Sequence, residues 1–258
     1  MRRAAWLQAF GAVCAAAASP CVPAIADDHD DALTVGQRAY DELRSRGEIA
    51  ESSRYLPILR RIGGRIAAAA RPHWFEERFY VIRGSDINAF ASPGGYVYVY
   101  EGLLRNVDNA DELACVLGHE TAHLVLGHLE AKSRQQRRKS SLLNLGRIFG
   151  GAAAGSANAI GAASTVANYG YLNFTRQQEY AADELGTKLA AKAGFDPWGT
   201  VWFLQELERV AGDAGYEQYV QQHPSTSDRI ARIQAFLHAD RARYGRWSPQ
   251  PANTAGLL

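Results

Sequence analysis

The sequence predicts an α+β fold that is mainly helical, with a small antiparallel sheet beside one central helix. Apolar residues recur at helical spacing over long segments in both halves of the chain, whereas strand-like runs are confined to residues 78–100. No helix of crossover length separates these runs, and strands joined in this way are expected to pair antiparallel. The chain therefore predicts a helical domain with one short sheet near its middle.

The first 26 residues have the pattern of a secretory signal peptide. Arg2 and Arg3 precede an uncharged, alanine-rich stretch, and the small residues of 24–26 offer a cleavage site. A Ser-Pro-Cys-Val-Pro stretch interrupts the apolar run before it reaches the length of a membrane span. We therefore expect a cleaved signal at 1–26, export of the protein, and a single domain over residues 27–258.

Charge and cysteine content exclude several classes of protein. The formal net charge of the whole chain is only +1, so no broad basic surface is expected and nucleic acid is not an expected partner. Cys14 and Cys21 leave with the signal peptide, which leaves Cys115 alone. The exported protein then has no internal disulfide, and we interpret Cys115 as a packing residue.

Two amphipathic helices and three strands are expected before the central helix. The strands are rich in aromatic and β-branched residues, and a Pro-Gly-Gly turn joins the last two. The expected ranges are 32–48 and 54–70 for the helices, and 79–82, 88–91 and 96–100 for the strands.

The central helix carries the most informative motif of the chain. Asn109 can cap its first turn, Glu112 stands at the capping-box position, and the helix is expected to extend to about Glu130. His119 and His123 are four residues apart, so their imidazoles lie on one helix face and can hold one zinc ion. Without a metal, the same pair is two ordinary histidines on a helix face.

A catalytic zinc site needs a third protein ligand. A third histidine just beyond the pair is one pattern, but Gly127 and His128 each miss its register by one residue, and its methionine turn is absent. Glu179 and Asp183 supply the other pattern on a helix that Thr175 can cap, with both carboxylates on one face. Glu179 can then bind zinc while Asp183 accepts a hydrogen bond from a ligand imidazole. The alternative is an exposed acidic face.

His128 follows His123 by five residues. On a continuous helix this separation from the pair places it on another face, so we interpret it as structural. The remaining expected helices cover 175–194, 196–210 and 227–239. Residues 148–171 are uncharged and rich in Gly, Ala, Ser and Asn. We expect them to cover the active site, and the alternative is a peripheral contact with the outer membrane or an envelope protein.

Several segments together resemble the M48 family of zinc metallopeptidases. They are Asn88–Gly95, Asp111–Ala114 running into His119, Thr175-Arg176-x-x-Glu179-x-x-Ala182-Asp183, and His223-Pro224 with Arg229. The resemblance implies a zincin-type domain with one Zn²⁺ per chain, ligated by the two histidines and a glutamate. It further implies a periplasmic endopeptidase, and we expect polypeptide substrates among extended or misfolded envelope proteins, in protein quality control. The alternative is a latent metalloprotein that acts mainly as a chaperone or adaptor.

The expected mechanism gives Glu120 the role of general base toward a zinc-activated water. His223 is the first candidate for a donor to the developing oxyanion. Two alternatives stay open for it: a loop histidine that caps local backbone, and a fourth zinc ligand that holds a resting enzyme latent. Arg229 and Arg176 are weaker candidates, equally explained by salt bridges to Asp183 or its neighbours.

The strand that begins at Asn88 is the expected substrate platform. If residues 88–91 form a free edge beside the central helix, an extended peptide can add to them as a further strand. Asn88, Ala89 and Phe90 are therefore the candidate substrate-binding residues. The alternative is an ordinary edge strand shielded by the glycine-rich segment.

Overall fold

The structure, a computed structural model, describes residues 24–135, 173–209, 219, 221, 223 and 226–251. Residues 1–23 of the expected signal peptide and the expected cover at 148–171 lie outside the described residues. The expected cleavage position after residue 26 falls in the first turn of the first described helix. Among the described helices, none combines the length and the apolar character needed to cross a bilayer.

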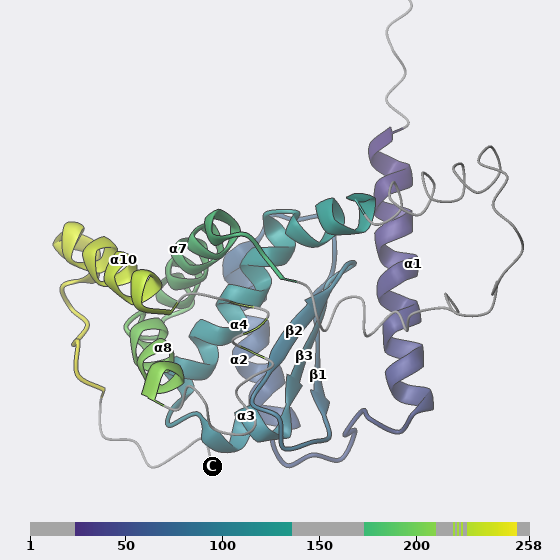
Figure 1. The fold of residues 1–258 in the computed structure, drawn as a ribbon, viewed down its shortest axis with the longest axis horizontal. Helices are drawn as coiled ribbons and strands as arrows, with labels where there is room; N and C mark the ends of the chain where they lie inside the picture. The colour runs from purple at the N-terminus through teal and green to yellow at the C-terminus, as the bar shows by residue number, and fades with distance from the viewer. Residues whose placement is uncertain are drawn as a thin grey trace, which may run out of the picture.

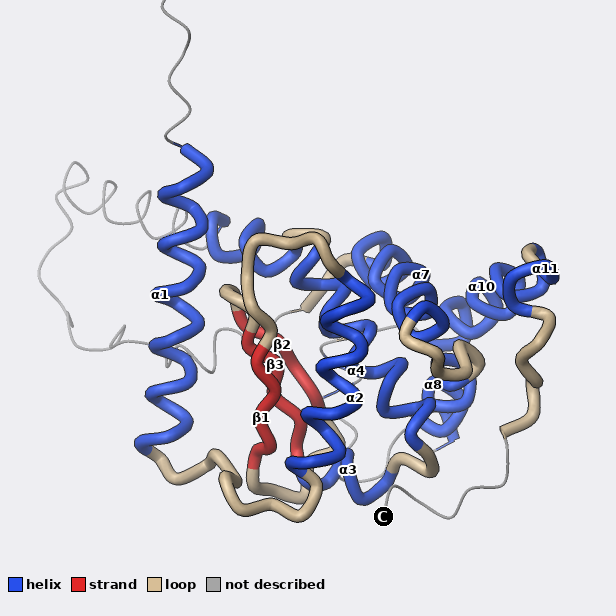
Figure 2. Tube along the Cα trace, turned by 180° about the vertical axis from the view of Figure 1, so that it is seen from behind, coloured by secondary structure: helices blue, strands red, loops and turns tan. Residues whose placement is uncertain are grey.

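Helices dominate the described residues, as the sequence predicts, and three short strands form a single sheet (Figures 1 and 2). The elements in chain order are α1 (Ala24–Ser45), α2 (Leu56–Ala70), β1 (Arg78–Ile82), β2 (Ala89–Ser92), β3 (Tyr96–Tyr100), α3 (Glu101–Asn106), α4 (Ala110–Val125), α7 (Arg176–Lys192), α8 (Gly199–Arg209), α10 (Thr226–Ala239) and α11 (Arg241–Tyr244). Figure 1 shows α4 between the sheet on one side and α7, α8 and α10 on the other.

The sheet is mixed, which corrects part of the prediction. β2 and β3 are antiparallel, as expected, with Ala89 opposite Val99. β1 and β3 are parallel, with Arg78 opposite Tyr96, and the strand order is β1-β3-β2. No crossover helix is needed between β1 and β3. Strand β2 runs in the opposite direction and returns the chain, and β3 then lies between β1 and β2. The expectation of an all-antiparallel sheet is wrong for this reason.

Side chains alternate between the two faces of β3, and each face has its own cover. Val97 and Val99 join the main core with α2 and α4. Tyr96 and Tyr98 join a second cluster with Leu43 of α1. This period of two is what a strand buried on both faces produces. Figure 2 shows the sheet between α1 and the layer of α2 and α4.

The start of α4 agrees with the prediction, and its end does not. Asn109 caps the helix by accepting a hydrogen bond from the Glu112 backbone N–H at 2.9 Å. The helix stops at Val125 instead of continuing to about 130. Gly127 follows with a φ of +68°, and helical structure resumes over residues 128–135. A glycine in the left-handed region is a common helix terminator, so the chain changes direction just after the histidine pair.

α4 and α7 cross at two glycines, and this crossing sets the position of the site. A Cβ on Gly118 would lie 2.7 Å from the carbonyl oxygen of Gly186. A Cβ on Gly186 would lie 2.7 Å from the backbone nitrogen of His119. Because any side chain here would overlap backbone atoms, the two helices approach at a distance that only glycine permits. The crossing brings the carboxylates of α7 to the histidines of α4.

Candidate metal centre

His119 and His123 point the same way from the second half of α4. Their Nε2 atoms are 3.1 Å apart, and the two residues are 4% and 0% exposed. The spacing of four residues places both rings on one face, as predicted. Burial lowers the pKa of His123 to about 3, so this imidazole is neutral and can offer a lone pair to a metal.

Glu179 comes from the first turn of α7 and meets both imidazoles. Its Oε2 is 3.6 Å from Nε2 of His119, and its Oε1 is 3.4 Å from Nε2 of His123. The predicted capping box of Thr175 and Gln178 is present at the start of this helix. Glu179 is completely buried, so the alternative of an exposed acidic face is wrong.

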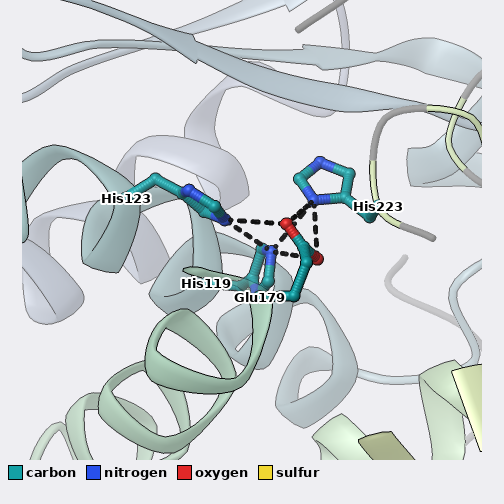
Figure 3. Close-up of side chains that lie close together, drawn as sticks. All are labelled: His119, His123, Glu179 and His223. Atoms are coloured by element: carbon teal, nitrogen blue, oxygen red, sulfur yellow. Dashed lines mark hydrogen bonds and ion pairs between the residues drawn. The ribbon is translucent and has the colours of Figure 1, made fainter. Parts of the chain in front are cut away.

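His223 joins the same group from outside these two helices. Its Nδ1 lies 3.2 Å from Nε2 of His119 and 3.1 Å from each carboxylate oxygen of Glu179. With His123, these residues offer four ligand atoms that all lie within 4.8 Å of one another (Figure 3). The side chain of His223 is directed at the group and not at local backbone, which disfavours the backbone-capping alternative.

The four donors fit a small divalent cation. Atoms held tetrahedrally at about 2.1 Å from a zinc ion lie roughly 3.3 to 3.4 Å from one another. Five of the six pairs of residues bring donor atoms to 3.1 to 3.6 Å of each other when either carboxylate oxygen of Glu179 is taken, and with one atom from each residue all four lie within 4.8 Å of one another. Burial would raise the pKa of Glu179, but His223 and Arg229 outweigh it and hold the pKa well below its usual range. Two imidazole nitrogens and an ionised carboxylate form one of the ligand sets found in catalytic zinc sites.

Asp183 and Arg229 lie outside the group of four donor residues and contact its members. Oδ1 of Asp183 is 3.0 Å from Nδ1 of His119, the outer nitrogen, as the spacing from Glu179 predicts. Arg229 donates to both oxygens of Asp183, at 2.6 and 2.7 Å, and its Nη1 lies 3.0 Å from Glu179. Burial would raise the pKa of Asp183, but Arg229 lowers it to about 2. The expected salt bridge from Arg229 to Asp183 is confirmed, whereas Arg176 is exposed.

His128 contacts the group, which corrects its interpretation as a purely structural residue on another face. Its Nδ1 lies 3.1 Å from Nδ1 of His123. On a continuous helix His128 would lie on another face, but α4 ends at Val125. The left-handed turn at Gly127 brings His128 back to the outer nitrogen of His123.

Glu120 lies beside the donors and does not belong to them. Its Oε1 is 3.6 Å from Nε2 of His223, and the residue is 2% exposed. Burial raises the pKa of Glu120. A carboxylate with a raised pKa is a better proton acceptor near neutral pH.

The three candidate substrate-binding residues divide between the two faces of the sheet. β2 pairs with β3 alone among the described strands, so it is an edge strand of this sheet. Ala89 packs in the core with α4, whereas Phe90 packs in the cluster on the α1 side. Asn88 precedes β2, is completely buried, and has no hydrogen-bond partner for its side-chain amide among the described residues. The structure therefore brings Ala89, but not the ring of Phe90, to the side of α4.

Two aromatic residues near the donors were missed by the sequence analysis. The Phe174 ring lies 3.9 Å from that of His123, and the Tyr219 ring lies 4.7 Å from that of His223. Both residues are buried. Phe174 directly precedes the Thr175 cap and Tyr219 stands four residues before His223, which are the sequence signals that could have indicated them.

Comparisons with known proteins agree with this geometry. The profile of peptidase family M48 matches residues 57–237. The chain is 30% identical over 227 residues to the beta-barrel assembly-enhancing protease of Yersinia pestis, which covers 86% of the chain and 46% of that protein. It is 33% identical over 209 residues to the mitochondrial metalloendopeptidase OMA1 of Schizosaccharomyces pombe, covering 79% and 60%.

A third relative is similar in length. The chain is 26% identical over 215 residues to the metalloprotease LoiP of Escherichia coli, covering 80% of the chain and 81% of that protein. In contrast, the chain spans less than two thirds of the length of the other two relatives.

Proposed function

Because the chain belongs to peptidase family M48, we propose that it is a zinc-dependent endopeptidase with one Zn²⁺ held by His119, His123 and Glu179. One observation carries this proposal. Two helices and a separate residue bring four buried donor atoms within 4.8 Å of one another, and the pairs that His123 forms with His119 and Glu179 lie near the separation that a tetrahedral metal requires. These ligands match the gluzincin pattern of two histidines and a glutamate from a second helix.

The residues around the donors have separate roles in this proposal. When bound, zinc makes a water acidic enough to lose its proton near neutral pH and polarises the scissile carbonyl. Glu120 accepts the proton of the attacking water and later returns it to the leaving amine. Asp183, whose Oδ1 lies 3.0 Å from Nδ1 of His119, favours the tautomer that carries its proton on Nδ1, so that Nε2 keeps its lone pair for the metal.

We assign His223 the position of a fourth donor in a resting conformation. Its Nδ1 lies among the other donor atoms, which supports this role over capping of local backbone. A fourth protein ligand takes the corner that water and substrate need, so the site is latent in this conformation. The Nε2 of His223 faces Glu120, so a small rotation away from the metal leaves it close enough to donate to an oxyanion.

The proposed substrates are extended or misfolded polypeptides of the cell envelope. An edge strand whose backbone can pair with a peptide imposes little sequence preference. The name of the Yersinia pestis relative, a beta-barrel assembly-enhancing protease, supports a role in quality control of envelope proteins. We therefore propose a periplasmic location after removal of a signal peptide, with peripheral contact to the outer membrane or its proteins.

Metal analysis paired with cleavage of unfolded casein tests the proposal. Wild type is expected to hold one zinc and to cleave casein, whereas Glu179→Ala loses both. Glu120→Gln keeps the zinc and loses cleavage. Glu184→Ala is the matched control, because Glu184 is an exposed carboxylate on the same helix whose partner is Lys188.

Two outcomes would contradict the proposal. If Glu179→Ala binds zinc with wild-type affinity, Glu179 is not the third ligand. Full function of Glu120→Gln in the cell, without cleavage, would favour the chaperone or adaptor alternative.

A further inference from the structure

The Nδ1 atoms of the two α4 imidazoles, which point away from the donor group, have different partners. Nδ1 of His119 faces a carboxylate, Asp183, at 3.0 Å. Nδ1 of His123 faces a second imidazole, that of His128, at 3.1 Å. The first arrangement follows from the sequence motif, and the second follows only from the turn at Gly127. Nothing in the proposed mechanism uses His128.

We infer that His128 is a positioning residue that holds His123 in the tautomer able to bind the metal through Nε2. This inference rests on the proposed function, because it assigns a task in the same site. Two nitrogens 3.1 Å apart share one proton, so one of them donates and the other accepts. If Nε2 of His123 offers its lone pair to zinc, the proton of that ring is on Nδ1. Nδ1 of His128 is then the acceptor, and the proton of His128 is on its Nε2.

The surroundings of His123 leave its outer N–H with few alternative partners. His123 is 0% exposed, and the Phe174 ring lies 3.9 Å from its own ring. A buried N–H that loses its acceptor carries the full cost of desolvation. Among the described side chains, His128 is the one that provides an acceptor to this nitrogen, so its removal favours the other tautomer, in which Nε2 carries the proton and cannot bind zinc.

The geometry also explains why a neutral acceptor suits this position. Glu179, Glu120 and Asp183 already place three carboxyl groups within or beside the site, and Arg229 contacts two of them. A carboxylate in place of the half-buried His128 would add a fourth carboxyl group beside the site. An imidazole fixes the tautomer without adding charge.

Zinc affinity, measured by competition with a chromophoric chelator, tests the inference. All proteins carry Glu120→Gln so that autolysis does not interfere. His128→Phe keeps a ring of similar size and removes the acceptor, and we expect it to weaken zinc binding by about 10- to 100-fold. His128→Asn places an amide oxygen close to the position of the imidazole Nδ1, and we expect it to recover most of that loss.

Two further variants complete the design. His238→Phe is the matched control, because His238 is an exposed histidine on α10 whose described contact is the Trp198 ring. His128→Ala removes the acceptor without adding bulk and serves if the phenylalanine variant does not fold. The absorption spectrum of bound Co²⁺ gives a second readout, since a changed tautomer of His123 alters the coordination and a loss of packing alone does not.

The outcomes separate the inference from the function on which it rests. Wild-type zinc affinity in His128→Phe or His128→Ala overturns the inference and leaves the proposed function intact. Equal weakening in His128→Phe and His128→Asn, with an unchanged Co²⁺ spectrum, also overturns it, because packing is then the cause. Failure of the parent protein to bind zinc at all contradicts the proposed function itself.

Discussion

Arg229 shows at the scale of single residues how the charges of the site are balanced. It is among the largest fully buried side chains of the described residues, at 1% exposed. It contacts Asp183 through two donors, Glu179 through a third, and the backbone oxygen of His223. One guanidinium therefore joins a ligand, the residue behind another ligand, and the loop of the fourth donor. A planar fork with five donors can do this, and a lysine cannot.

Replacement of Arg229 by methionine is expected to destabilise the protein strongly. The change leaves two buried carboxylates without their cation, and breaking a buried pair in this way typically costs about 3–5 kcal/mol of unfolding free energy. Arg176→Met, at an exposed position one turn from Glu179, should change stability by less than about 0.5 kcal/mol. Chemical denaturation of both metal-free variants measures the difference. Equal effects of the two substitutions would show that the carboxylates do not need Arg229.

Glu77 predicts a pH dependence of stability outside the metal group. Burial raises the pKa of Glu77 from its ordinary value of 4.5 to about 7, and the nearby Thr121 hydroxyl lowers it only in part. Its Oε2 lies 3.9 Å from Nε2 of His73. The folded protein therefore holds this proton where the unfolded chain has released it. Stability is expected to fall as pH rises from about 4.5 to about 7, by at most about 3 kcal/mol.

Glu77→Gln tests that dependence, because the amide keeps the shape and cannot ionise. The variant should gain stability relative to wild type as pH is raised from 5 to 8. Denaturant unfolding of both proteins at several pH values gives the difference, in which metal effects common to both cancel. If the difference in unfolding free energy between the two proteins does not change from pH 5 to 8, Glu77 is already ionised in the folded protein over that whole range.

Local spacing was enough to predict which side chains of α4 and α7 lie together, and it failed where the path of the chain mattered. His119, Glu120, His123, Glu179 and Asp183 follow from the spacing of residues within two helices and from a family resemblance. The contact of His128 depends on where α4 ends, and that end is set by a left-handed glycine rather than by periodicity. Aromatic neighbours such as Phe174 are equally non-local, since no pattern indicates which ring they will contact.

At the scale of elements, helix starts were predictable and strand pairing was not. The caps Asn109 and Thr175 satisfy backbone groups a few residues away, so sequence alone contains both partners. The parallel pairing of β1 with β3 depends on the strand order, in which β3 lies between β1 and β2. That choice is made by the packing of α1 and α2 on the two faces, which short strand patterns do not encode.

The glycine crossing of α4 and α7 yields a prediction at this scale. Gly186→Ala places a methyl group 2.7 Å from the backbone nitrogen of His119, so the helices must separate. We expect a loss of about 1–3 kcal/mol in stability together with weaker zinc binding, because Glu179 moves away from the histidines.

Gly64→Ala is the matched control for this prediction. Gly64 is exposed in the interior of α2, and a Cβ there meets nothing within 4 Å. The same substitution should therefore stabilise the protein, by about 0.5–1 kcal/mol, without changing zinc affinity. Thermal unfolding and chelator competition on both variants provide the comparison. Normal zinc affinity in Gly186→Ala would show that the close crossing is not required to align the donors.

At the scale of the whole molecule, the metal centre links parts of the chain that are distant in sequence. The α4 helix packs on the sheet beside α2, whereas α7 and α8 contact α4 from the side away from the sheet. Helix α10 supplies Arg229. The donors come from residues 119, 123, 179 and 223. A cation bound by these four residues would therefore join the two halves of the described chain.

Removal of the metal should lower stability without unfolding the protein. His123 is neutral when buried, and Arg229 still contacts both Glu179 and Asp183, so each of these carboxylates keeps a cationic partner. A ligand present at about 1,000 times its Kd stabilises the folded state by about 4 kcal/mol. For a chain of this size that corresponds to a fall in Tm on the order of 10 °C on chelation. Scanning calorimetry with and without chelator, and after return of zinc, measures it.

Two variants decide whether this stabilisation arises at the proposed centre. Glu120→Gln keeps every ligand, so it should show the full fall in Tm on chelation and full recovery with zinc. Glu179→Ala lacks the carboxylate that joins α7 to α4, so its Tm should be nearly the same with and without chelator. A large chelator effect that persists in Glu179→Ala would place the stabilising metal elsewhere, since a site on α4 alone cannot hold the two helices together.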